Sequence, residues 1–166
     1  MRFDNKQTLT AADLINQASE EELANIIFEF GEERYSRKIA KSIKSTKNIL
    51  TALDLKEAIR RATPPHKRNK TLARVFQAIR IAVNSEIEKL KIFLNIFFDY
   101  LTVGGRIIIM SYHSIEDRMV KHAFRSLKES GKLNILTKKP VIPSSDELAS
   151  NNRSRSAKLR AAERLI

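Results

Sequence analysis

The segment Gly104–Arg125, GGRIIIMSYHSIEDRMVKHAFR, constrains the fold of this chain more than any other. Its run Ile107–Met110 is too apolar and too rich in β-branched residues for an exposed strand. We therefore expect a strand that is covered on both faces, as in a parallel or mixed sheet between helices. A helix is expected to follow, with Ser114 as its N-cap, Asp117 completing a near-capping box and Gly131 at its end. An α/β fold follows from this pattern.

The polar residues between the predicted strand and helix form the first candidate site. Open α/β sheets bind ligands outside the carboxyl ends of their strands, and these residues stand at such an end. The candidates are Ser111, Tyr112, His113, Ser114 and Glu116. The alternative is that this corner only turns the chain and caps the helix, as any strand-to-helix connection must.

The charge balance predicts a polyanionic partner. Thirty-one Lys and Arg residues stand against nineteen Asp and Glu, for a formal net charge of +12, and nucleic acid is the first candidate. The basic stretches lack a Trp/Phe-rich opposite face, which disfavours a membrane surface. The chain has no cysteine, so disulfides are excluded and no metal site is predicted. A hydrophobic signal core and membrane-spanning runs are absent from the sequence, so a cytoplasmic protein is expected.

Glycine is scarce, and this scarcity limits cofactor binding. The only glycines are Gly31, Gly104, Gly105 and Gly131. The spacing of these four glycines matches no glycine-rich loop motif that binds phosphate or a nucleotide. If this is a nucleotide-type α/β protein, its cofactor loop is expected outside this chain.

The first part of the chain predicts four short helices. Thr10 is expected to cap a helix over Ala11 to Ala18, and Ser19 with Glu22 forms a capping box for a second helix that ends at Gly31. A third helix is predicted from about Glu32 to Ser45 and a fourth from Thr51 to Ala62. These four helices would form a small helical subdomain.

The middle of the chain predicts a basic loop and then a long amphipathic helix. The densest basic segment, HKRNKTLAR from His66 to Arg74, is interpreted as a loop that follows a phosphate backbone, with a solvated linker as the alternative. Apolar residues then recur at helical spacing from Leu72 to Leu101. Asn84–Ser85 is expected to kink or split this helix, and its apolar width suggests burial against a sheet.

The last part of the chain predicts shorter elements. A strand is expected from Leu133 to Val141, a helical turn from Ser144 to Ala149, and a basic loop from Asn151 to Arg155. Residues Ser156–Leu165 are ambiguous, because their composition favours a helix whereas the alternation of apolar and charged residues favours a strand.

Five motifs in order give the sequence a family resemblance. GGRIIIMSYHSIEDRMVK closely resembles the GGR…ISFHSLEDR…VK segment of the bacterial 16S ribosomal RNA (cytosine-N4)-methyltransferase family, formerly the MraW family. FGEERYSRKIA, RVFQAIRIAVNSEIEKL, KKPVIPS and NNRSRSAKLRAAER resemble further motifs of that family, and the opening MRFD resembles its internal MRMD. Two departures are Tyr112 in place of Phe and Asn152 in place of Pro.

The resemblance implies a fold and a domain layout. The fold would be the C-terminal part of a class I (Rossmann-like) S-adenosylmethionine-dependent methyltransferase sheet with an all-α insertion subdomain. Residues 1–7 would be a remnant of the methyltransferase domain, 8–70 the insertion, and 71–166 the C-terminal part of the sheet domain. In such a sheet the last two strands are adjacent and antiparallel, which assigns Ser156–Leu165 to a strand.

The resemblance also implies that part of the family protein is missing. The MRMD motif is internal in the family, so this chain is expected to be an N-terminally truncated form. The missing part would carry the glycine-rich loop for S-adenosylmethionine and the acidic residue for its ribose. S-adenosylmethionine is therefore the family cofactor, but we expect no binding by this chain alone, and the chain is expected to be inactive by itself.

The activity that the resemblance implies is N4-methylation of a cytosine in 16S ribosomal RNA of the small ribosomal subunit. The exocyclic amine is a poor nucleophile, so the site must align it and provide a route for its proton, with the base unstacked in a pocket. His113 would orient the base or relay a proton, and Tyr112 would stack on it. The residues expected to bind RNA phosphates are Lys38, Lys41, Lys67, Arg68, Lys70, Arg74, Arg80, Arg153, Arg155, Lys158 and Arg160.

Two other functions stay open from the sequence. The chain would be a non-catalytic RNA- or ribosome-binding module, or one half of a split methyltransferase that a separate cofactor-binding polypeptide completes. In each case the strand at residues 106–112 is expected to have one unpaired edge, with Phe93, Phe97 and Phe98 incompletely covered. Such a surface favours self-association or pairing with the missing half.

Overall fold

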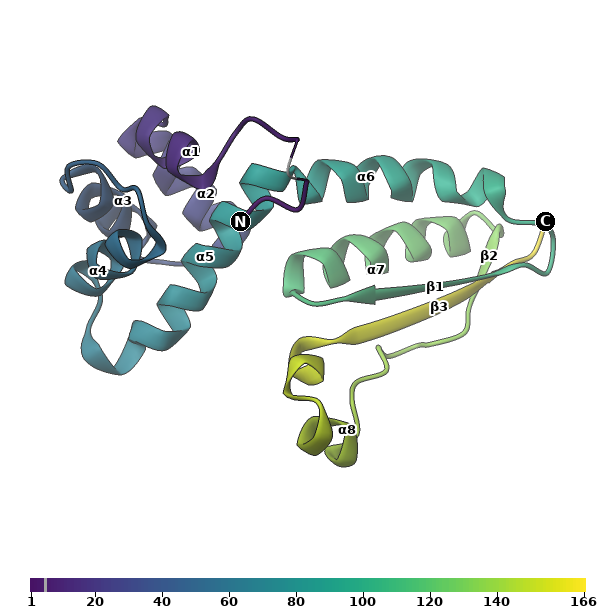
Figure 1. Cartoon of the computed structure of the whole chain (residues 1–166). Coiled ribbons are helices and arrows are strands. Elements are labelled where there is room, and N and C mark those ends of the chain that lie inside the picture. The colour runs from purple at the N-terminus through teal and green to yellow at the C-terminus, as the bar shows by residue number, and fades with distance from the viewer. Residues whose placement is uncertain (5) are drawn as a thin grey trace. The chain divides into compact units, whose positions relative to one another are not determined.

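The computed structural model describes residues 1–4 and 6–166, and the chain divides into two compact units (Figure 1). Unit 1 comprises Met1–Glu86 and unit 2 comprises Ile87–Ile166. The boundary therefore lies later than the expected end of the helical subdomain at residue 70. The assignment of residues 8–70 and 71–166 to an insertion and a sheet domain stays a prediction about the family fold.

Unit 1 is helical, and its first, second and fourth helices begin where the sequence predicts, whereas the third begins at Ser36 rather than at about Glu32. Capping boxes with both reciprocal hydrogen bonds form at Thr10, Ser19 and Thr51, since each of these side chains accepts a backbone N–H that the helix leaves unpaired. Its helices are α1 (Ala11–Gln17), α2 (Glu20–Gly31), α3 (Ser36–Lys44), α4 (Ala52–Ala62), the 3-10 turn η1 (Pro65–Lys67) and α5 (Arg68–Asn84).

Helix α5 is the central helix of unit 1, because α1, α2 and α4 all contact it. The core is formed by side chains from each of these helices, including Leu23, Ile59 and Val75, which are fully buried. A Cβ on Gly31 would lie 2.8 Å from the backbone oxygen of Arg74. Glycine at this position therefore permits the close approach of α2 to α5.

The prediction of a loop from His66 to Arg74 was wrong. Residues 65–67 form η1 and Arg68 begins α5. Pro65 fits the first position of a helical turn, where its missing N–H costs nothing. After it, no glycine or proline interrupts the segment, and burial of Thr71 and Val75 draws it onto the core. The predicted break is confirmed, because α5 ends at Asn84.

Unit 2 is an α/β unit with a three-stranded sheet. The strand order is β1-β3-β2, and β3 is antiparallel to both neighbours. The strand assignment of Ser156–Leu165 is therefore confirmed. The elements are α6 (Glu86–Ile96), the 3-10 turn η2 (Phe97–Tyr100), β1 (Arg106–Ser111), α7 (Ser114–Glu129), β2 (Leu133–Ile135), α8 (Ser145–Ser150), the 3-10 turn η3 (Asn152–Ser156) and β3 (Lys158–Arg164).

Two features of this unit differ from the sequence predictions. The strand predicted from Leu133 to Val141 ends at Ile135, and Val141 returns only as an isolated bridge to Leu159. Within α6 no residue is fully buried, but Leu94 packs against the core that includes Ala162 of β3, so the predicted burial against the sheet holds only for the C-terminal end of the stretch. Phe97, in η2, is buried instead and packs 5.9 Å from the ring of Phe124.

The two faces of the sheet differ in their cover. On the inner face, Ile107 and Ile109 pack with α7 through a core that includes Val120 and Phe124. On the outer face, Ile108 is 65% exposed and Met110 is 51% exposed. The prediction of a strand covered on both faces is therefore wrong for the part of the chain that the structure describes.

The edge of the sheet is also as exposed as the sequence predicted. Among the described strands, β1 pairs only with β3, so its other edge is unpaired. Phe93 is 43% exposed and Phe98 is half-buried, as predicted, but Phe97 is buried, so the prediction was wrong for that residue. Within the described residues, none of the helices has the length and apolar character needed to cross a membrane.

Candidate functional site

The corner between β1 and α7 is built differently from the predicted one. Strand β1 ends at Ser111, which is buried, and the N-cap of α7 is His113 rather than Ser114. The imidazole Nδ1 of His113 accepts a hydrogen bond from the backbone N–H of Glu116 at 3.4 Å. An imidazole nitrogen can therefore replace the hydroxyl oxygen that a cap normally supplies.

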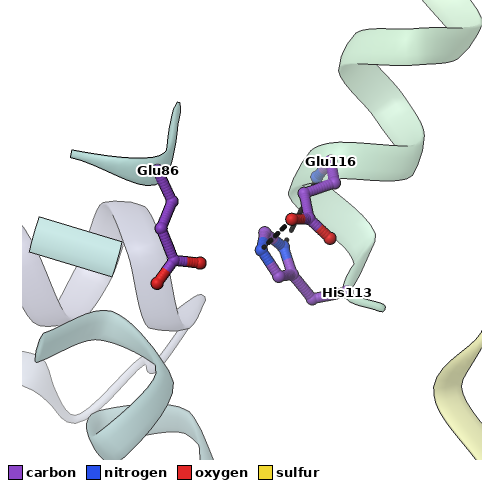
Figure 2. Close-up of side chains that lie close together, drawn as sticks. All are labelled: Glu86, His113 and Glu116. Atoms are coloured by element: carbon purple, nitrogen blue, oxygen red, sulfur yellow. Dashed lines mark hydrogen bonds and ion pairs between the residues drawn. The ribbon is translucent and has the colours of Figure 1, made fainter. Parts of the chain in front are cut away.

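His113 and Glu116 form the centre of this corner (Figure 2). His113 is 8% exposed. Its Nε2 lies 3.4 Å from Oε1 of Glu116 but has no hydrogen-bond partner among the described residues. Since Nδ1 accepts a bond, the proton of the neutral ring is on Nε2. A buried donor without a hydrogen bond costs free energy, so Nε2 can donate to an acceptor that is brought next to Glu116.

Glu116 is held as a carboxylate. Its Oε2 accepts a hydrogen bond from the backbone N–H of Tyr112 at 2.9 Å. Burial raises the pKa of Glu116, but its contact with the His113 side chain and its interactions with the backbone N–H groups of Tyr112 and His113 together lower it by more, so its pKa lies below the usual value. The group is therefore ionised at neutral pH and accepts hydrogen bonds or a proton.

Asp117 does not close a capping box but joins the helix to the sheet. Its carboxylate accepts two hydrogen bonds from Arg160 of β3, at 2.7 and 3.2 Å, and lies 3.4 Å from Nζ of Lys158. Burial raises the pKa of Asp117, and the bonds and charges of Arg160 and Lys158 outweigh it, so the pKa lies below its usual range. The pair fixes the first turn of α7 against β3.

A groove lies on the outer face of the sheet, beside the corner. It has a volume of about 360 Å³ and contains Tyr112, Arg153 and Leu159 in its lining. Tyr112 is 53% exposed there, whereas His113 and Glu116 do not line this groove. The structure therefore does not bring all five predicted residues into one pocket. Sequence reasoning missed the apolar wall at Val141–Pro143, although the KKPVIPS motif covers it.

The predicted phosphate-binding residues differ in their availability. Arg160 is buried in its pair with Asp117. Arg80 donates two hydrogen bonds of 2.9 Å to Glu86, and Arg74 lies 3.5 Å from the buried carboxylate of Glu33. Lys158 and Arg68 are half-buried. The exposed members of the set are Lys38, Lys41, Lys67, Lys70, Arg153 and Arg155.

Comparison with known proteins places the chain in a family. A model of the MraW methylase family matches residues 1–165. A ribosomal RNA small subunit methyltransferase H of Kosmotoga olearia is 51% identical over 99% of this chain and 57% of its own length. The protein of that name from Thermotoga neapolitana is 53% identical over 98% of this chain and 55% of its own length. The chain thus spans little more than half the length of these relatives, and by sequence it belongs to the MraW methylase family.

Proposed function

We propose that this chain is part of an S-adenosylmethionine-dependent enzyme that methylates the N4 amine of a cytosine in 16S ribosomal RNA. The observation that carries the proposal is the corner at His113 and Glu116, a buried donor without a partner beside an ionised carboxylate, within a chain that the family matches over residues 1–165. The names of the relatives, ribosomal RNA small subunit methyltransferases, support the substrate.

The chemistry of the corner suits a cytosine amine. The lone pair of that amine is delocalised into the ring, so the reaction needs a fixed orientation and an acceptor for the proton that leaves. The Nε2–H of His113 would donate to a ring acceptor of the base. The carboxylate of Glu116 would accept from the amine and hold its proton. Tyr112 and Arg153, in the adjacent groove, would contact the RNA that flanks the base.

The cofactor is assigned to a part of the enzyme that this chain does not contain. S-adenosylmethionine supplies the methyl group on its sulfonium when it is bound. The four glycines of the chain do not form a glycine-rich loop, so the residues present do not fit this cofactor. We therefore infer that the segment of the relatives beyond the match holds it, and that this chain is inactive by itself.

The sheet supports the same fold assignment. The order β1-β3-β2, with β3 antiparallel to both neighbours, is the arrangement expected for the last strands of a class I (Rossmann-like) methyltransferase sheet. In that fold, the unpaired edge of β1 would face the strands that a cofactor-binding part supplies. Unit 1 would then be the all-α insertion.

A non-catalytic role is the second candidate function, and the net charge of +12 is compatible with it. A basic module of this kind would bind ribosomal RNA or the small ribosomal subunit without chemistry. A split enzyme, completed by a separate cofactor-binding polypeptide, is the third. An experiment can separate the non-catalytic module from the split enzyme, since only the split enzyme regains methyl transfer when the other part is added.

Reconstitution tests the proposed function. The chain is mixed with a polypeptide that covers the unmatched part of the Thermotoga neapolitana relative, and transfer of labelled methyl groups to small ribosomal subunits is measured. We expect activity in the mixture, and a loss of about 100-fold with His113→Ala, as is typical for a lost orienting or proton-transferring group. Full activity of the His113→Ala mixture would contradict the assigned role, and an inactive mixture of well-folded parts would favour the non-catalytic module.

The same experiment has a cofactor-binding arm. We expect that calorimetric titration of the chain alone with millimolar S-adenosylmethionine gives no saturable signal, and that the mixture gives one. Saturable binding by the chain alone would overturn the assignment of the cofactor to the other part.

RNA binding by the chain is expected to depend steeply on salt. If about six phosphates of a single strand are neutralised, the logarithm of the affinity falls with the logarithm of salt concentration with a slope of about −4. Fluorescence anisotropy of a labelled RNA across a potassium chloride series measures this slope. A flat response would show that the +12 charge serves solubility rather than RNA binding.

A further inference from the structure

In unit 1 the chain turns between α2 and α3 (Figure 1), and a second surface with features of a binding site lies at this turn. A groove of about 600 Å³ opens there. We call it the α2–α3 groove. Its lining residues are Asn25, Phe28, Glu29, Arg34, Tyr35, Ser36, Arg37 and Lys38. Only Lys38 among these belongs to the phosphate-binding set predicted from the sequence.

The groove combines exposed aromatic rings with positive charge. Phe28 is 58% exposed and Tyr35 is 43% exposed, although burying either ring in a core would be favourable. Three cationic side chains, those of Arg34, Arg37 and Lys38, line the same groove against one carboxylate, that of Glu29. Aromatic faces beside a cationic surface are the two elements that sites for single-stranded nucleic acid combine.

Tyr35 is held in place by contacts from α5. The buried carboxylate of Glu33 accepts hydrogen bonds from the backbone N–H of Tyr35 and from the hydroxyl of Thr71, both at 3.1 Å. It also lies 3.5 Å from the guanidinium of Arg74. The turn that carries Tyr35 is therefore anchored on the core helix of unit 1, so its ring is presented at little cost in conformational entropy.

A further cation lies against the same ring. Nζ of Lys67 is 5.1 Å from the centroid of Tyr35 and 3.2 Å from its hydroxyl oxygen. This contact orients the ring by a cation–π interaction and adds a fourth positive charge next to the groove. Part of the basic segment His66–Arg74 thus contacts an aromatic ring of this groove.

We propose that the α2–α3 groove binds single-stranded RNA, with bases stacked on Phe28 and Tyr35 and phosphates paired with Arg34, Arg37 and Lys38. The inference rests on the proposed function in taking RNA as the partner, but it assigns a separate site in unit 1. Double-stranded RNA keeps its bases stacked inside the helix and offers no face to the rings. An acidic protein would satisfy the charges but would leave the two rings without stacking partners.

The test compares RNAs that differ only in their bases. The full chain, Phe28→Leu and Tyr35→Leu are titrated by anisotropy with a labelled single strand about ten nucleotides long and with an abasic strand of equal length. Leucine keeps apolar bulk and removes the π face. We expect each substitution to weaken binding of the normal strand about 5- to 100-fold and to leave binding of the abasic strand unchanged. Tyr100→Leu, which alters a ring of unit 2 that is 81% exposed, is the matched control and is expected to change neither.

A charge variant separates stacking from phosphate binding. Lys38→Gln should weaken binding of both strands and make the salt slope shallower by about 0.7, whereas Phe28→Leu should leave the slope unchanged. Equal loss on the normal and abasic strands in the leucine variants would overturn the proposal, because the rings would then act through the fold. Unchanged binding in the leucine variants, or equal weakening of double-stranded RNA binding, would overturn it as well.

Failure of the groove proposal can be told apart from failure of the proposed catalytic function. If the leucine variants bind RNA as the unaltered chain does while the reconstituted mixture methylates small subunits, the groove is wrong and the function stands. If the leucine variants lose single-strand binding while the mixture shows no methyl transfer, the groove stands and the catalytic function is wrong.

Discussion

Asp117→Ala is expected to destabilise unit 2 by about 3 to 5 kcal/mol, the usual cost of breaking a buried ion pair by removing one partner. The Arg160 side chain is only 9% exposed and would lose both of its hydrogen bonds to Asp117 while it stays buried. Urea unfolding followed by hydrogen exchange of peptides from β1 and β3 measures the loss in this unit separately from unit 1.

Two control variants separate the contribution of the Asp117–Arg160 ion pair from other effects on stability. Arg125→Ala removes an ion pair with Glu129 whose side chains are 67% and 64% exposed, and it should cost less than about 1 kcal/mol. The double substitution of Asp117→Leu with Arg160→Met replaces the pair by apolar side chains, and it should recover most of the stability. A double variant as unstable as Asp117→Ala would show that the cost comes from packing rather than from the unpaired guanidinium.

The stability contributed by Asp117 should vanish in acid. Because the folded pKa of Asp117 is lowered from its ordinary value of 3.8, the contribution is complete well above pH 3.8 and falls as the pH drops through the lower folded pKa. The difference in stability between the unaltered chain and Asp117→Ala should therefore shrink between pH 5 and the acid limit of folding, at about pH 3 or below. A difference that is independent of pH over this range would mean that the carboxylate charge is not the cause.

The isolated chain is expected to self-associate through the sheet of unit 2. The edge of β1 is unpaired among the described strands, and the outer face exposes Ile108, Met110 and Val141. Unpaired edges and apolar patches favour association with another chain. Size-exclusion chromatography with light scattering should give a mass above the 19.0 kDa of one chain.

A substitution on the outer face should prevent this association. Ile108→Lys places a charge beside the free edge, and we expect it to return the chain to a monomer. Ile92→Lys, on α6, changes a residue that is 61% exposed and should leave the mass of the assembly unchanged. A dispersed monomer of the unaltered chain, with cooperative unfolding and no binding of hydrophobic dyes, would refute the prediction.

Local hydrogen bonding allowed the sequence to determine the starts of several elements. The caps at Thr10, Ser19 and Thr51 depend on a side chain and a backbone group three residues apart, so the sequence alone contains the whole interaction. The end of α5 at Asn84 was likewise predicted from neighbouring residues. The strand at Lys158–Arg164 was ambiguous by propensity and alternation, and only the family resemblance assigned it.

Tertiary structure decided the features that depend on distant partners. Asp117 was predicted as a cap residue, but it pairs with Arg160, 43 positions away in the sequence, and this removes Arg160 from the exposed cations. The apolar run Ile107–Met110 predicted a strand but not which face would be covered, because cover comes from other elements.

In the candidate sites, too, local sequence determined some features and distant partners decided others. The sequence found His113 and Glu116 as neighbours, since they lie on one turn, but it placed the cap on Ser114. The sequence did not predict the α2–α3 groove, although Phe28 and Tyr35 are only seven positions apart. The exposure of Tyr35 depends on a turn that Glu33 anchors to Thr71, 38 positions away. Residue type and local spacing therefore determined where elements begin and which groups carry chemistry, whereas long-range packing decided which of those groups stay exposed, since exposure is a property of the folded chain.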